Sequence, residues 1–134
     1  MAQTSQPRIT QVTYHRISTD AKGGTSFDTV TVEQSLLRAA PPAAPFYVSE
    51  DGPASKYRFY TFKPGWVGDW HPAPAQQFLA LMTGTVEMET TDGMVRQFFP
   101  GDLVLLQDTS GKGHLTRNVG NGNATFFVVP VPGV

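Results

Sequence analysis

The sequence predicts an all-β domain built as a sandwich or barrel. Short apolar runs recur along the whole chain, and we count about eight to ten of them as strands. The 13 glycines and 11 prolines fall between these runs, where they mark turns. Only residues 33–39 are compatible with a helix, which argues against alternating strand–helix units.

The N-terminal third predicts two strands, over residues 9–14 and 27–34. Residues 33–39 fit either a continuation of the second strand or one to two helical turns, and the pattern leaves both open. The next segment, AAPPAAP at 39–45, predicts a surface loop because its prolines lack the amide donor that a helix or central strand needs.

The strongest strand prediction covers residues 56–63, KYRFYTFK, because aromatic residues favour strands. Asp92-Gly93 predicts a hairpin turn and Pro100-Gly101-Asp102 a further turn. The remaining strands are predicted at 77–83, 85–90, 94–98, 103–107, 113–118 and 124–131.

The 134 residues predict a single domain over 1–134, with residues 1–7 as a loose tail. The net charge of -1 excludes the basic footprint that nucleic-acid binding requires, so no nucleic-acid partner is expected. The chain has no apolar run long enough to span a bilayer and a polar N-terminus, so no membrane partner is expected. With no cysteine, the chain has no disulfide framework, and we expect a cytoplasmic protein.

The specific signal lies in the middle of the chain. Gly65 stands six residues before His71, and Gln77 and Gly84 follow. A second block begins at Gly101 and continues through Gly111, His114 and Asn118. These two blocks resemble the two sequence motifs of the cupin superfamily, and they cover about half of the chain.

The resemblance implies a double-stranded β-helix, or jelly-roll barrel, with the strands from residue 56 onward forming the barrel. It also implies a divalent metal (Zn, Fe, Mn or Ni) held inside. Ala73 occupies the position of the second motif histidine, and Gln77 that of the glutamate; Gln107 stands in place of the motif proline. The implied ligands that remain are His71 and His114, with the carbonyl oxygen of Gln77.

Three interpretations of this reduced set remain open. A weakly bound metal would be strongly Lewis-acidic, because no carboxylate lowers its charge. Without a metal, His71 and His114 would be free imidazoles able to act as general acid or base, and Gln77 a hydrogen-bonding group for the substrate. Alternatively, both histidines are satisfied core residues without a ligand.

Strand alternation predicts which neighbours share the cavity. If His71 points inward, so does Asp69, and if His114 points inward, so does Thr116. Trp66 and Trp70 bracket the first motif and are predicted to line the mouth of the pocket.

The same alternation places Gln77, Leu79 and Leu81 inward, and Phe78, Ala80 and Met82 outward. An outward apolar row suggests a homodimer interface, and the alternative is a second packed layer within one chain.

These observations predict a small-molecule-binding protein of the cupin type. We expect an enzyme of the lyase, isomerase or oxygenase type that uses His71, Gln77 and His114, although the incomplete ligand set weakens the oxygenase interpretation. The alternative is a non-catalytic small-molecule sensor or binding module with a vestigial metal site.

Overall fold

The computed structural model describes residues 6–133, which form ten strands and no helix. The predicted all-β class is confirmed. The chain divides into two compact units: unit 1 comprises Met1–Thr13 and Val30–Gly52, and unit 2 comprises Tyr14–Thr29 and Pro53–Val134. Most of the predicted tail at 1–7 lies outside the described residues, and the single domain over 1–134 stays a prediction.

The strands follow the predicted order, with one addition. The predictions did not include β3, and β1 and β2 are longer than expected. The bounds are β1 Ile9–Thr19, β2 Thr25–Leu37, β3 Phe46–Val48, β4 Arg58–Phe62, β5 Gln77–Thr83, β6 Val86–Glu89, β7 Val95–Phe98, β8 Leu103–Leu106, β9 Leu115–Asn118 and β10 Ala124–Pro130.

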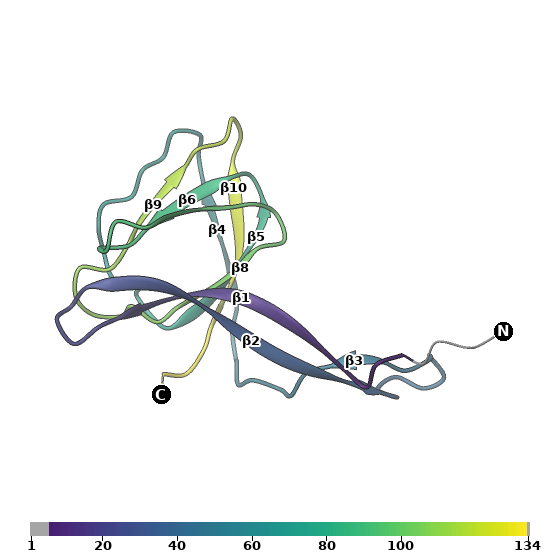
Figure 1. Ribbon diagram of the computed structural model, residues 1–134. Helices are drawn as coiled ribbons and strands as arrows, with labels where there is room; N and C mark the ends of the chain where they lie inside the picture. The colour runs from purple at the N-terminus through teal and green to yellow at the C-terminus, as the bar shows by residue number, and fades with distance from the viewer. Residues whose placement is uncertain (1–5, 134) are drawn as a thin grey trace. The chain divides into compact units, whose positions relative to one another are not determined.

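Unit 2 contains two sheets. The larger has the strand order β2-β1-β8-β5-β10-β4, and the smaller has the order β7-β6-β9. Figure 1 labels all of these strands except β7. Neighbouring strands from β4 to β10 are antiparallel, whereas β1 pairs with β8 in parallel. The strands after residue 56 form the smaller sheet and four strands of the larger one, whereas β1 and β2, which the prediction left outside the barrel, extend the larger sheet beyond β8.

The two sheets of unit 2 share one core. In β5, Gln77, Leu79 and Leu81 are buried, while Met82 at its end is exposed, so the predicted alternation is confirmed. The buried side chains of both sheets form one hydrophobic cluster, and full burial of a residue such as Phe126 contributes about 1.5–3 kcal/mol. Two sheets packed face to face over one core give the jelly-roll arrangement that the sequence predicts.

Unit 1 contains the order β3-β2-β1, with Ser35 of β2 opposite Val48 of β3. The hydroxyl of Tyr47 donates to the carbonyl oxygen of Pro7 at 2.6 Å. Because β2 continues to Leu37, the helical alternative for residues 33–39 is wrong. Residues 39–45 form the predicted loop without a strand.

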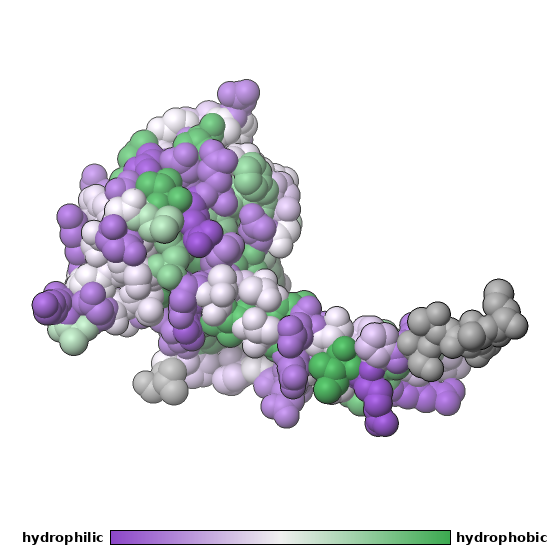
Figure 2. Space-filling view, viewed as in Figure 1, coloured by the Kyte–Doolittle hydropathy of each residue, from purple (hydrophilic) through white to green (hydrophobic). Residues whose placement is uncertain are grey.

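The surface carries polar and apolar side chains together, as the mixed purple and green atoms in Figure 2 show. Within residues 6–133, no helix has the length and hydropathy needed to cross a bilayer. The exposed large apolar side chains in unit 2 include Tyr57, Phe59 and Met82.

Candidate functional site

The two motif histidines lie directly opposite each other. His71 and His114 form an isolated antiparallel bridge, in which each amide donates to the other's carbonyl oxygen, at 3.2 and 3.0 Å. Their imidazole rings are 5.1 Å apart between centroids and tilted by 56°. Residues 43 positions apart in the sequence are therefore brought side by side by backbone hydrogen bonds.

A glycine makes this approach possible. Gly113 has φ of +80°, and a Cβ built on it would lie 1.9 Å from the carbonyl oxygen of His71. Any side chain at this position would push the two backbone segments apart, and a positive φ is itself unfavourable for other residues. The Gly-His pair at 113–114 is thus the local sequence feature that sets the two rings close together.

Both histidines line one cavity of about 220 Å³ in unit 2. Its wall is mostly apolar and aromatic, and the ring of Trp66 stacks on that of Phe62 at 4.2 Å and 13°. The cavity holds roughly seven water-sized groups at about 30 Å³ each. It is lined by Tyr60, Phe62, Trp66, His71, Pro74, Gln77, Leu79, Met88, Leu106, His114 and Thr116.

The structure brings five of the seven predicted site residues to this cavity. His71, Gln77, His114, Trp66 and Thr116 all line it, and Gln77 is only 2% exposed. Gln77 starts β5 between Leu106 and Pro130, its partners in β8 and β10.

Asp69 and Trp70 do not line the cavity. Asp69 is exposed, and the ring of Trp70 lies 4.7 Å from Nζ of Lys112. The alternation argument placed Asp69 inward, but alternation applies to a continuous strand. His71 belongs to an isolated bridge instead, so its neighbours need not alternate.

Asp108 is a site residue that the sequence did not indicate. Its carboxylate oxygen Oδ2 lies 2.6 Å from Nδ1 of His114, and the Asp108 and His114 side chains are 0% and 3% exposed. Among the described residues, the other carboxylate oxygen of Asp108 has no hydrogen-bond partner. No motif position corresponds to Asp108, so only the fold reveals the contact.

Hydrogen bonds indicate which ring nitrogen of each histidine carries the proton. Nδ1 of His71 lies 2.9 Å from the carbonyl oxygen of Pro72, which only accepts hydrogen bonds. Nδ1 of His114 faces the carboxylate of Asp108, which also only accepts when it is ionised. Both Nδ1 atoms therefore carry the proton, and in each neutral ring Nε2 keeps a free lone pair.

Asn118, the last residue of the second motif, has a structural role. Its Nδ2 donates to the carbonyl oxygens of Phe62, Lys63 and Gly122 at 3.0, 3.0 and 2.9 Å. Its Oδ1 accepts from the amide of Gly120 at 2.9 Å. The side chain thus ties the segments 62–63 and 120–122 to β9, and it does not line the cavity.

The donor set does not fit a firmly held divalent ion. Within the described part of the chain, no three His, Asp or Glu side chains are grouped to hold one. Gln77 offers a neutral amide, and Asp108 contacts the Nδ1 side of His114, away from the lone pair. The ion implied by the motifs stays a prediction. Acid–base chemistry at this cavity needs only the side chains.

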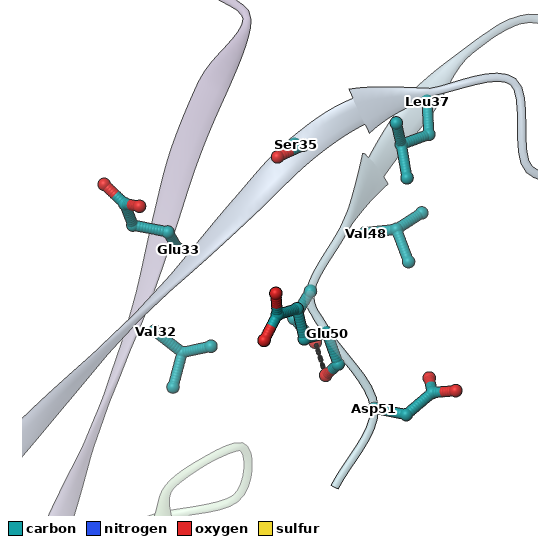
Figure 3. Close-up of a pocket in the computed structure, with 8 residues that line it drawn as sticks. Val32, Glu33, Ser35, Leu37, Val48, Glu50 and Asp51 are labelled. Carbon is teal, nitrogen blue, oxygen red and sulfur yellow. Dashed lines mark hydrogen bonds between the residues drawn. The ribbon is translucent and has the colours of Figure 1, made fainter.

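A larger hollow of about 640 Å³ lies in unit 1. Its lining side chains are acidic, hydroxylic and aliphatic, and Ser49 Oγ donates to the carbonyl oxygen of Glu50 at 3.1 Å (Figure 3). The motif residues, from Gly65 to Asn118, all belong to unit 2, so this hollow shares no residue with the candidate site. Its lining is Val32, Glu33, Ser35, Leu37, Val48, Ser49, Glu50 and Asp51.

Comparison with protein-family models finds no match, and comparison with curated protein sequences finds none either. Solved structures similar to this chain include a conserved protein of unknown function from Streptococcus pyogenes (18% identity, TM-score 0.45), covering 58% of this chain and 65% of that one. A cupin domain from Bordetella pertussis has 22% identity and TM-score 0.47, covering 63% and 88%. A Cupin 2 conserved barrel domain protein from Salinispora arenicola has 24% identity and TM-score 0.48, covering 75% and 76%.

The two packed sheets of unit 2, with His71 and His114 bridged beside their shared core, define the class of the fold: an all-β double sheet of the jelly-roll type.

Proposed function

We propose that the cavity of unit 2 is the active site for proton transfer on a small, largely apolar molecule that carries one carbonyl group. The observation that carries this proposal is the meeting of His71, Gln77 and His114 in one cavity with an otherwise apolar wall. Such a site is typical of small-molecule binding, in which a few polar groups fix the orientation of an apolar body.

The side chains support acid–base chemistry. Imidazole exchanges protons near neutral pH, and each ring has its Nε2 lone pair free. One Nε2 takes the proton from the carbon next to the carbonyl group, and the electron pair moves to the carbonyl oxygen. The amide N–H of Gln77 is a suitable donor to the oxygen that becomes negative.

The fate of the resulting enolate separates two reaction types. Return of the proton to another carbon is an isomerisation. In a lyase reaction, the electron pair returns from the oxygen to form a C=C bond, and the substituent on the β-carbon leaves with its bonding pair and takes a proton from the imidazolium. Neither reaction changes the overall oxidation state, so neither requires an oxidant.

The test follows deuterium exchange in D2O. Cyclohexanone and acetophenone are probes with about seven and nine non-hydrogen atoms, a size that matches room for roughly seven water-sized groups. The protein should accelerate the loss of their exchangeable C–H signals in proton NMR, and His71→Ala combined with His114→Ala should abolish the acceleration. Equal rates with and without the wild-type protein would contradict the proposal.

A second candidate, a non-catalytic binding module, is favoured by the stacked rings of Trp66 and Phe62 in the wall. Stacked aromatic rings bind a flat ligand without chemistry. Saturation-transfer NMR on the same probes separates the two: binding without exchange supports the module, and binding with exchange supports the enzyme.

A further inference from the structure

The two histidines of the cavity have different surroundings. His114 is buried, and its Nδ1 bonds to a carboxylate that is itself fully buried. His71 is exposed, and its Nδ1 bonds to a neutral backbone carbonyl oxygen at 2.9 Å. His71 therefore stands at the mouth of the cavity, and His114 in its interior.

This difference decides how firmly each ring is held. The ring of His114 is held by the carboxylate of Asp108, with 2.6 Å between Oδ2 and Nδ1, and both side chains are buried. Charge-assisted hydrogen bonds are stronger than neutral ones, and a low local dielectric strengthens them further. The carbonyl oxygen of Pro72 gives His71 only a dipole, and solvent reaches that ring.

The buried carboxylate of Asp108 lowers the stability of the fold, so stability does not explain its presence. Among the described residues its second carboxylate oxygen is buried without a partner, although buried polar atoms usually have one. Burial of an incompletely paired carboxylate costs stability that an apolar side chain would not. Local rules of this kind are broken mainly at functional sites.

We infer that Asp108 is a positioning residue that fixes the ring of His114, that His114 is the base of the proposed reaction, and that His71 binds the ligand at the mouth. The catalytic part of this inference rests on the proposed function. The positioning part concerns the protein without ligand and is testable by itself.

The positioning part is tested by nitrogen-15 NMR of the histidine rings. In the wild-type protein, Nδ1 of His114 should show the shift of a protonated nitrogen. In Asp108→Asn the amide offers both a donor and an acceptor, so we expect a mixture of the two ring tautomers. An unchanged His114 spectrum in a folded Asp108→Asn protein would overturn the inference.

The catalytic part is tested by the exchange assay with cyclohexanone. Asp108→Asn and His114→Ala should each lower the exchange rate about 100-fold or more at saturating probe, while probe affinity stays within a few-fold. His71→Ala should mainly weaken probe binding. Asp108→Glu, which keeps the carboxylate, should recover part of the rate lost in Asp108→Asn.

Asp51→Asn, an exposed aspartate of unit 1, is the matched control and should leave the rate unchanged. Equal losses of rate in His71→Ala and His114→Ala would overturn the division of roles. If the wild-type protein exchanges no probe, the proposed function fails, whereas the ring spectrum still decides whether Asp108 positions His114.

Discussion

The backbone of Gly113 lies against the carbonyl group of His71 so closely that no side chain fits between them. A Cβ on Gly113 would lie 1.9 Å from that oxygen, and the φ of Gly113 is +80°. This contact holds the bridge between His71 and His114, on which the geometry of the candidate site depends.

Gly113→Ala should therefore destabilise the protein by about 2–4 kcal/mol, because it adds a steric clash to an unfavourable φ. Urea unfolding followed by circular dichroism measures the change. Gly122→Ala is the matched control, since a Cβ there meets nothing within 4 Å, and it should change stability by less than about 0.5 kcal/mol. Similar losses in both variants would contradict the close contact.

The predicted metal site leads to a test on Gln77. Gln77→Glu should raise the affinity for Zn²⁺ about tenfold or more, because it adds an anionic ligand beside two imidazoles. Isothermal calorimetry with zinc chloride measures the affinity, and elemental analysis of protein purified without chelator gives the occupancy. Gln76→Glu is the control, because the side chain of Gln76 bonds to Pro132 and does not line the cavity. If Gln77→Glu binds no tighter than wild type, the two rings and residue 77 do not share an ion.

The ion pair of Arg16 and Asp28 leads to a pH dependence. The Arg16 side-chain hydrogen bond, at 2.9 Å from Nε to Oδ1, holds the pKa of Asp28 below its usual value. A lowered folded-state pKa stabilises the protein above the unfolded-state pKa of about 3.9, and this stability is lost as the pH falls through the folded-state pKa.

Asp28→Asn should accordingly destabilise the protein at pH 7 by at most about 1 kcal/mol, because both side chains are partly exposed and solvent screens the pair. The difference from wild type should shrink at about pH 3, below the unfolded-state pKa, because the Asp28 carboxyl loses its charge as the pH falls toward the folded-state pKa. Urea unfolding at the two pH values checks this. A difference that persists at the lower pH would show that the aspartate stabilises the fold by other means than its charge.

The outer face of the larger sheet leads to a prediction about assembly. Phe78 and Ala80 are half-buried, Met82 is 51% exposed, and Phe59 packs against Phe127 on the same outer side at 5.4 Å. This face joins apolar side chains of β4, β5 and β10, and an apolar face of this kind suits a two-fold pair of identical faces. The homodimer stays a prediction.

Light scattering at micromolar concentration should give twice the mass of one chain, and Met82→Glu should shift the protein to monomer by placing a charge in the apolar interface. Met94→Glu is the matched control, since Met94 is 47% exposed but lies at the turn before β7, away from this face. A wild-type monomer, or an equal effect of both variants, would count against the interface.

Much of the site was predictable because it depends on local rules. The period of two along β5 placed Gln77, Leu79 and Leu81 on the buried face. Successive side chains of a strand point to opposite faces, so one buried residue decides the direction of all the others. The resemblance to the cupin motifs, and no local rule, predicted that His71 and His114 meet in one cavity. Local pattern alone also predicted nine of the strands, and for β5 it predicted both ends.

Other features depended on pairing between distant segments, which no local pattern contains. Periodicity could not tell which face of β4 meets the cavity, and the pairing of Tyr60 with Phe126 and of Phe62 with Ala124 decided it. Asp69 points away because His71 lies in a bridge instead of a strand. Asp108 reaches His114 because the chain turns back between them. In the sequence Asp108 is one of several loop aspartates, and only the tertiary structure makes it the buried partner of a histidine.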